Sequence, residues 1–199
     1  MDFDLTKEQK FIQKAAREFA KGEFTDVARD LDINETYPEK IVKKARELDL
    51  IGLFIPETYG GPGLGYLEQA MVLEEFWKVD PGIGQQLSSI SFGAEELLLF
   101  GTEEQKKKWL PPLFEGNAVM GFAITEPDAG SDTASAATTA VRDGDEYVIN
   151  GSKVMIGNGT VGTFMLVYCL TNPEEERKTA RHSILIVETD RDGYKAEPM

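Results

Sequence analysis

From the start of the chain to about Asn117, apolar residues recur at the three- and four-residue spacing of helices. Thr6 and Gln9 have the spacing of a capping box, which predicts the start of a first helix. The apolar face of this helix comprises Phe11, Ile12, Ala15, Ala16 and Phe19. Pro38 suits the first turn of a second helix, which ends near Gly52. The apolar face of the second helix comprises Ile41, Val42, Ala45 and Leu48.

Two longer helices and a second capping box complete the helical pattern. A third helix covers residues 66–80, and a fourth runs from about residue 83 to residue 100. Pro81 and Gly82 interrupt the helical structure between them. Thr102 and Gln105 repeat the capping-box spacing at the start of a last helix. The pair Pro111-Pro112 ends that helix, because proline lacks the backbone donor that a helix interior needs.

After Asn117 the pattern changes to short apolar runs separated by turn dipeptides such as Asp143-Gly144. These runs cover residues 118–124, 138–141, 147–149, 154–156, 164–170 and 183–187. Strands at hairpin spacing, without helices between them, favour an antiparallel barrel or sandwich over a doubly wound parallel sheet. The expected fold class is therefore α+β, with an N-terminal all-α domain over residues 1–117 and a β domain over residues 118–199.

The loop that follows the first apolar run is the strongest candidate for chemistry. Pro127 and Gly130 end the strand, because proline lacks a ladder donor and glycine tolerates positive φ. The sequence Gly130-Ser131-Asp132 leaves backbone N–H groups unshielded, and such a turn can form a nest of donors for phosphate, to which the Ser131 hydroxyl adds one more. The alternative is an ordinary surface turn, since the same residues dominate turns for local reasons.

Composition and charge exclude several classes of function. A net charge of −14, with 21 basic residues dispersed among 35 acidic ones, makes nucleic acid an unsuitable partner. The single cysteine, Cys169, lies in an apolar run and is expected to be a small buried side chain in a reducing compartment. The acidic N-terminus shows no signal or transit peptide, and no stretch reaches membrane-spanning length, so we expect a cytoplasmic protein without membrane insertion.

The one histidine, His182, supports neither a metal site nor a nucleophilic triad. A metal site needs clustered histidine, cysteine and acidic ligands, and no nucleophile motif accompanies this residue. We therefore expect no metal and a surface position for His182.

Five segments, in order along the chain, resemble the flavin-dependent acyl-CoA dehydrogenases. The candidate loop, residues 124–132 (ITEPDAGSD), is similar to the first signature of that family. Upstream, the resemblance includes residues 55–61 (IPETYGG) and residues 101–110 (GTEEQKKKWL). Downstream it includes residues 144–153 (GDEYVINGSK) and residues 156–159 (IGNG), where the second flavin segment of the family lies. The resemblance covers essentially the whole chain.

The resemblance implies FAD as the cofactor and assigns roles to residues of the candidate loop. The backbone around Phe122, Ile124 and Thr125 is expected to face the pyrimidine edge of the flavin, with the Thr125 hydroxyl donating to it. Ser131 is expected to reach the FAD pyrophosphate and to border the pantetheine arm of the acyl-CoA substrate. For Thr125, the alternative is a β-branched strand residue whose hydroxyl is satisfied within the protein.

The second flavin segment, Met155-Ile156-Gly157, departs from the family pattern of an aromatic residue, isoleucine and a hydroxyl residue. Met155 can still pack against the flavin plane through its thioether, but with a less defined shape. Gly157 offers only its backbone N–H where the hydroxyl would sit beside the nitrogen that accepts hydride. We therefore hypothesise weaker or differently tuned flavin binding.

In the family that this chain resembles, a carboxylate from a C-terminal helical domain removes the α-proton of the thioester while hydride passes to the flavin. No acid of this sequence can be assigned that role, so the catalytic base is expected beyond Met199 and the 199 residues alone are expected to be inactive. The resemblance also implies electron-transfer flavoprotein as the partner and a homo-oligomer, either a tetramer or a dimer.

Three functions remain open at this level. The first is α,β-dehydrogenation of an acyl-CoA thioester, the second is a flavin-poor structural subunit of a mixed-subunit assembly, and the third is an enoyl-CoA reductase or hydroxylase of the same fold. Chain length and branching of the acyl group stay open. The helix aligned with the acyl cavity of the family carries Gly84 and Ser88, whose small side chains are expected to leave room there.

Overall fold

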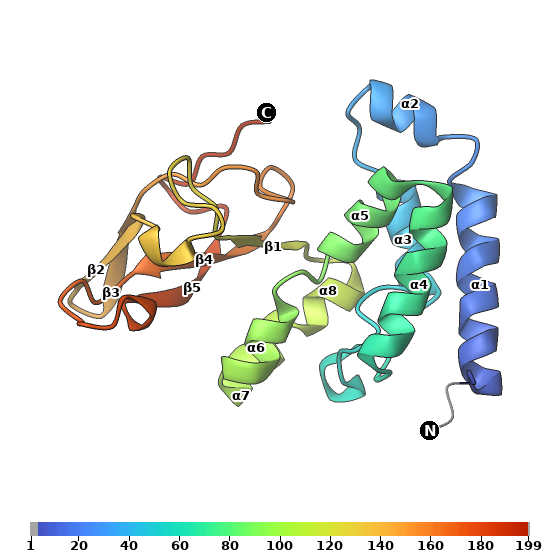
Figure 1. The fold of residues 1–199 in the computed structure, drawn as a ribbon, viewed down its shortest axis with the longest axis horizontal. Helices are drawn as coiled ribbons and strands as arrows, with labels where there is room; N and C mark the ends of the chain where they lie inside the picture. Colours follow the sequence, from blue (N-terminus) through green and yellow to red (C-terminus); the bar gives the residue numbers. More distant parts are fainter. Residues whose placement is uncertain (1–3, 199) are drawn as a thin grey trace. The chain divides into compact units, whose positions relative to one another are not determined.

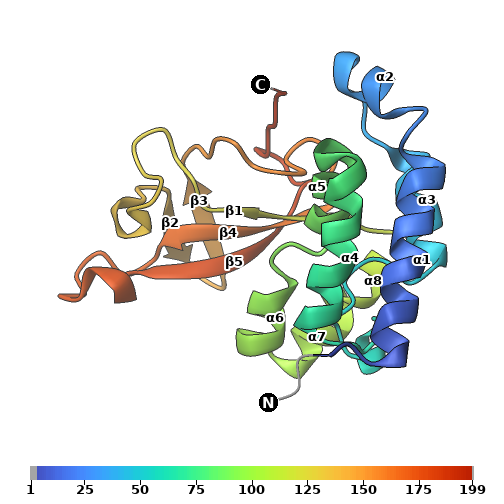
Figure 2. The same ribbon diagram turned by 45° about the vertical axis from the view of Figure 1, so that its right-hand side comes forward.

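The computed structural model describes residues 4–198, and the chain divides between Asn117 and Ala118 into two compact units (Figure 1). The first unit is helical, and the second is built on a β-sheet. Figure 2 shows strands β1, β4 and β5 of the second unit running alongside one another. The α+β class predicted from the hydrophobic pattern is confirmed.

The helical unit holds α-helices joined mostly by short connections, with a longer one over residues 48–65 between α3 and α4. Their bounds are α1 Lys7–Glu23, α2 Ala28–Ile33, α3 Glu39–Glu47, α4 Tyr66–Val79, α5 Pro81–Ser89, α6 Ala94–Phe100, α7 Glu103–Trp109 and α8 Pro111–Glu115, with one 3₁₀ turn, η1 Glu57–Tyr59. Three aromatic rings meet at the centre of its core: Phe19 and Phe24 are 5.8 Å apart between ring centroids, and each lies within 6 Å of Phe76. Burial of these large rings supplies much of the unit's hydrophobic stabilisation.

Both predicted capping boxes are present. The backbone N–H of Gln9 donates to the Thr6 hydroxyl at 3.1 Å, and the Gln9 side chain accepts from the N–H of Thr6 at 2.9 Å. Thr102 and Gln105 make the same reciprocal pair at the start of α7. Local sequence signals of this kind are reliable because both partners belong to the same helical turn.

The prediction of one continuous fourth helix is wrong. It is divided into α5 and α6 by a turn that ends at Gly93, whose φ is +105°. We expected Pro81 only to end the third helix, but it is also the first residue of α5. The Asp80 carboxylate caps this helix by accepting the N–H of Ile83 at 2.7 Å. Proline suits this place because the first residues of a helix have no intrahelical acceptor for their N–H groups. Helix α2 was not predicted.

The second unit contains five strands in one sheet. Their bounds are β1 Met120–Ala123, β2 Thr139–Asp143, β3 Glu146–Asn150, β4 Phe164–Leu170 and β5 His182–Glu188, with 3₁₀ turns η2 Thr133–Ser135 and η3 Lys178–Ala180. The order is β1-β4-β2-β3, and β5 also pairs with β4. Strand β4 is therefore central, and its residues from Phe164 to Val167 are buried.

The expectation of an antiparallel barrel or sandwich needs correction. Strands β2–β3 and β4–β5 pair antiparallel, but β1–β4 and β2–β4 pair parallel, so the sheet is mixed, and the described strands do not close into a barrel. Only β2 and β3 are joined by a tight turn; long connections separate β1 from β2 and β3 from β4. A long connection can return the chain to the starting end of the sheet, which parallel pairing requires.

The run at residues 154–156 does not form the predicted strand. Met155 has φ +57° and its side chain is 74% exposed. A left-handed residue interrupts an extended backbone, so the apolar composition of this run does not produce a strand. Among residues 4–198, no helix is both long and apolar enough to cross a membrane.

Candidate functional site

The loop that leaves β1 is closed by a pair of backbone hydrogen bonds. The N–H of Glu126 donates to the carbonyl of Ala129 at 2.9 Å, and the N–H of Ala129 donates back at 3.2 Å, which places Pro127 and Asp128 at the tip of a tight turn. Gly130 is not one of the described residues with positive φ. The sharp turn that the sequence predicts is therefore present, but this reciprocal pair closes it rather than a left-handed glycine.

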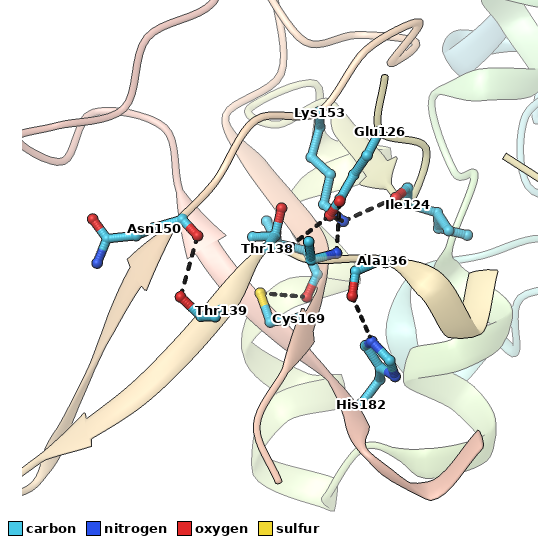
Figure 3. Close-up of polar contacts among 11 residues, drawn as sticks. Ile124, Glu126, Ala136, Thr138, Thr139, Asn150, Lys153, Cys169 and His182 are labelled. Atoms are coloured by element: carbon cyan, nitrogen blue, oxygen red, sulfur yellow. Dashed lines mark hydrogen bonds and ion pairs between the residues drawn. The ribbon is translucent and has the colours of Figure 1, made fainter. Parts of the chain in front are cut away.

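The carboxylate of Glu126 is buried in the middle of this region, with only 8% of the residue exposed. It accepts the N–H groups of Ala137 and Thr138 at 2.7 and 2.9 Å, and the ammonium group of Lys153 at 2.8 Å (Figure 3). These two N–H groups belong to the segment that enters β2. Glu126 thus connects the exit of β1 to the entrance of β2.

Lys153 connects the same loop to a third segment. Its Nζ donates to the carbonyl of Ile124 at 2.9 Å as well as to Glu126, and the next residue, Val154, donates its backbone N–H to the carbonyl of Thr125 at 2.9 Å. Two consecutive carbonyls of the loop are therefore bound by two consecutive residues of the segment before Met155. Figure 3 shows Lys153 and Glu126 meeting above Thr138, with Ile124 beside them.

A second set of contacts holds the residues after Met155 along β1. Asn158 is buried with φ +64°, and its side-chain amide donates to the carbonyl of Met120 at 2.8 Å. At Gly121, β1 lies against both the Gly157 backbone and the Met165 side chain. A Cβ at this position would lie 2.7 Å from the carbonyl oxygen of Gly157 and 2.6 Å from Sδ of Met165. The segment from Lys153 to Asn158 is thus fixed to β1 and its exit at several points.

The electrostatics of the Glu126–Lys153 pair favour its charged form. Burial alone would raise the pKa of the Glu126 carboxyl, but hydrogen bonds from Lys153, Ala137 and Thr138 outweigh that effect and lower the pKa to about 2. Both side chains are nearly closed to solvent, with 9% exposure for Lys153 and 7% for Glu126. A buried pair of this kind is stable only because each charge has several hydrogen-bond partners.

The structure brings the two sequence-predicted segments together. Ile124 and Thr125 are half-buried and bonded to the segment that continues into Met155, and Phe122 is a half-buried residue of β1. Ile156 packs its side chain against the core of the β unit. The remaining three predicted residues, Ser131, Met155 and Gly157, are exposed. All seven of these residues are at least partly exposed.

The polar groups of the predicted site are available for a ligand. Within residues 4–198, the hydroxyls of Thr125 and Ser131 make no hydrogen bond to another group of the protein. At Gly157, a Cβ would have no heavy atom of the described protein within 4 Å, so this face is open. These partly or fully exposed polar groups are available to a ligand as well as to water.

Sequence reasoning missed the two residues that organise the site, Glu126 and Lys153. Both lie within segments that carry the family resemblance, but they are 27 positions apart, and nothing in the spacing shows that they pair.

The expectation of a surface position for His182 is also wrong. Its ring is half-buried, stacks on Tyr168 at 4.7 Å between centroids, and has Nε2 2.9 Å from the carbonyl of Ala136. Among the described residues, no cluster of His, Cys, Asp or Glu could hold a metal ion.

The helical unit contains a separate cavity of about 220 Å³, lined by Phe54, Gln69, Leu73, Gln85, Ser88, Ser91, Phe92 and Glu95. Ser88 is one of the lining residues of this cavity. Gly84 does not, because the Trp77 indole fills its space: a Cβ there would lie 2.7 Å from Cδ1 of Trp77. Burial raises the pKa of the Glu95 carboxyl on the cavity wall.

Comparison with known proteins agrees with both units of the fold. The family model described as "Acyl-CoA dehydrogenase, N-terminal domain" matches residues 6–117, and "Acyl-CoA dehydrogenase, middle domain" matches residues 121–199. "Probable acyl-CoA dehydrogenase YngJ" of Bacillus subtilis is 40% identical, over 97% of this chain and 51% of its own length. "Acryloyl-CoA reductase (NADH)" of Anaerotignum propionicum is 38% identical, over 98% of this chain and 49% of its own length.

The fold also matches a solved structure from Acidaminococcus fermentans, described as an electron transferring flavoprotein in work on flavin-based electron bifurcation. The TM-score is 0.89 at 38% identity, over 97% of this chain and 50% of that chain. The chain thus spans about half the length of the curated relatives it matches. Because the two family models together cover nearly all of its residues, the chain belongs to the acyl-CoA dehydrogenase family.

Proposed function

We propose that this chain contributes the flavin-facing part of an enzyme that dehydrogenates the α,β bond of an acyl-CoA thioester. One observation carries the proposal: the two segments that family resemblance assigns to the flavin are bonded to each other through Lys153–Ile124 and Val154–Thr125. Two segments that are bonded to each other can both contact one ligand. Their contact therefore supports the assignment of both segments to the flavin.

The residues present fit FAD, which accepts hydride when bound. In this proposal the Thr125 hydroxyl and the backbone near Phe122 and Ile124 hold the pyrimidine edge of the ring. Ser131 donates its hydroxyl to the pyrophosphate and borders the pantetheine arm of the substrate. Met155 and Ile156 belong to the second flavin segment, and Gly157 offers its backbone N–H. The free hydroxyls of Thr125 and Ser131 support these roles.

The departure at Met155 and Gly157 supports weaker or differently tuned flavin binding. Met155 is exposed and unsupported by the core, so a flexible thioether replaces what would be a rigid ring. The open space at Gly157 leaves a missing hydroxyl unreplaced by any neighbouring side chain of the described residues. Absorbance of the purified protein at flavin wavelengths measures its flavin content, and a redox titration followed at the same wavelengths measures the reduction potential. Ordinary values of both would contradict weaker or differently tuned flavin binding. A protein without flavin would favour the structural-subunit alternative.

The catalytic base belongs, in this proposal, to the half of the relatives' length that this chain does not match. The 199-residue polypeptide is therefore expected to give no turnover with a panel of acyl-CoA thioesters and an artificial electron acceptor. Measurable turnover by the isolated polypeptide would show that one of its own carboxylates acts as the base.

A second candidate is reduction of an enoyl-CoA, favoured by the 38% identity to a protein named as an acryloyl-CoA reductase. The two reactions are distinguished with the full-length parent protein. A dehydrogenase oxidises the saturated thioester with an artificial acceptor, whereas a reductase consumes the unsaturated thioester when an electron donor is supplied. Hydroxylation is distinguished from both by its consumption of oxygen.

Partner and location extend the proposal further. Similarity to a chain in an electron transferring flavoprotein structure supports electron-transfer flavoprotein as the redox partner. We also propose a homo-oligomer, either a tetramer or a dimer, in the cytoplasm. Analytical ultracentrifugation of the full-length protein decides the first point, and fractionation of the host cell decides the second.

A further inference from the structure

We propose that the Glu126–Lys153 ion pair is the positioning element of the ligand-facing loop, residues 124–132. Lys153 holds the Ile124 carbonyl directly, and the backbone N–H of the adjacent Val154 holds the Thr125 carbonyl. The pair itself does not touch the ligand. That the ligand is a flavin rests on the proposed function, whereas the positioning rests on contacts within the chain.

The pair joins three segments that are separate in sequence. Glu126 lies at the exit of β1, its N–H donors lie at the entrance of β2, and Lys153 lies before Met155. No β-ladder connects the loop to the segment of Lys153. Besides the Val154–Thr125 bond, the described contacts between loop and segment therefore run through Lys153.

The direction of each carbonyl follows from these bonds. The Lys153 ammonium group takes the Ile124 carbonyl and the Glu126 carboxylate at the same time, at 2.9 and 2.8 Å. Because the Ile124 and Thr125 carbonyls are engaged by the protein, the peptide planes between these residues cannot rotate freely. Fixed peptide planes also fix the N–H groups in them and the direction in which the Thr125 side chain leaves the backbone, at the place that the proposed function assigns to the ring edge. Preorganised donors bind a ligand without the cost of ordering them.

Charge is needed because a neutral group cannot satisfy the same donors. The Glu126 carboxylate accepts three N–H donors and donates none. In Glu126→Gln one oxygen becomes an NH₂ group, which faces a donor whichever way the amide is turned. In Lys153→Met most of the unbranched side chain is kept, one atom shorter than lysine, but both hydrogen bonds of Nζ are lost. Each variant therefore releases the loop without opening a large cavity.

The experiment compares Glu126→Gln, Lys153→Met and the double variant with the wild-type chain. Arg191→Met is the matched control, because it breaks an exposed ion pair of the same unit, Arg191–Glu188, at 3.2 Å. The first readout is site-resolved amide hydrogen exchange, which needs no ligand. The second is the dissociation constant for FAD, with the absorbance spectrum of the bound flavin.

We expect the amides of Ala137 and Thr138 to exchange at least tenfold faster in Glu126→Gln, and that of Val154 at least tenfold faster in Lys153→Met. Amides of β4 and β5 should stay within twofold of wild type. We further expect FAD to bind at least tenfold more weakly to each single variant, with a shifted flavin spectrum. The double variant should bind FAD no more weakly than the worse single one, because the pair acts as a unit.

Three results would overturn the proposal. One is unchanged exchange at Ala137, Thr138 and Val154 in the single variants. Another is a loosened loop with wild-type FAD affinity and spectrum, which would make the pair merely structural. Equal effects of Arg191→Met would likewise reject it. If the wild-type chain binds no FAD, its flavin role in the proposed function fails, and the exchange data alone decide whether the pair positions the loop.

Discussion

Substitution of Gly121 by alanine is expected to disturb the candidate site from within β1. The added Cβ would lie 2.6 Å from Sδ of Met165 and 2.7 Å from the carbonyl oxygen of Gly157. Met165 is 1% exposed, so its side chain has no empty space to enter. The Gly157 oxygen belongs to the backbone, which must move away from β1 for the methyl group to fit. The disturbance is therefore directed at the second ligand-facing segment.

The expected cost follows from overpacking. Inserting one methyl group into a filled site destabilises a protein by about 1–3 kcal/mol. A central value of about 2 kcal/mol corresponds to a factor of about 30 in the equilibrium between closed and open states. We therefore expect amides of β1, and that of Gly159, to exchange about 30-fold faster in Gly121→Ala, up to the limit set by global unfolding of the unit.

Hydrogen exchange suits this measurement because it reports each unit separately. Tryptophan fluorescence would not, since Trp77 and Trp109 both lie in the helical unit. Gly157→Ala and Gly130→Ala are matched controls: a Cβ at either position meets no heavy atom within 4 Å, and neither residue has positive φ. Both should stay within about threefold of wild type, which corresponds to ~0.6 kcal/mol. Wild-type exchange in Gly121→Ala would refute the claim that β1 and the Gly157 segment are in close contact.

Three further outcomes are expected. Gly157→Ser places a hydroxyl in open space. Because this hydroxyl can restore one hydrogen bond, a titration should show FAD binding about 3- to 10-fold more tightly. Unchanged affinity would show that this position does not face the ring. Glu75 is held at a pKa of about 2, chiefly by the hydrogen bond from Arg17. Because this pKa lies below that of the unfolded chain, the stability gained, about 3 kcal/mol at most, is present above pH 4.5 and lost as the pH falls towards 2. Urea unfolding followed by tryptophan fluorescence should therefore show a pH dependence that Glu75→Gln reduces but does not abolish, since the pKa values of Glu68 and Glu103 in the same unit are also lowered. An equal pH dependence in the variant would show that Glu75 does not contribute to it. Burial raises the pKa of the Cys169 thiol to about 11, so a thiol reagent at pH 8 should react with it only after unfolding, and rapid reaction of the native protein would contradict its burial.

Elements whose signals lie within one turn or one run could be predicted from the sequence. The capping boxes at Thr6 and Thr102 were correct because both partners are three residues apart. The long apolar run of β4 was correct because a buried central strand is apolar on both faces. The run at residues 154–156 was wrong because apolar composition does not report the left-handed backbone of Met155.

Elements that depend on partners distant in sequence could not be predicted. Strand order and direction follow from long connections, whose path the sequence pattern does not record, so the parallel pairing of β1 with β4 was missed. Gly84 was misjudged for another reason: Trp77 is near in sequence, but the turn between α4 and α5 brings its ring against Gly84, and hydrophobic periodicity does not record the path of a turn.

The sequence by itself determined the α+β class, the positions of most helices and strands, and, through resemblance to a known family, the segments that are candidates for flavin binding. The tertiary structure alone decided that these segments meet, and that Glu126 and Lys153 join them. The physical reason is that hydrophobic periodicity acts over a few residues, whereas a buried ion pair exists only when folding removes both charges from water and supplies their partners. In this chain those partners come from three segments spread between Ile124 and Lys153.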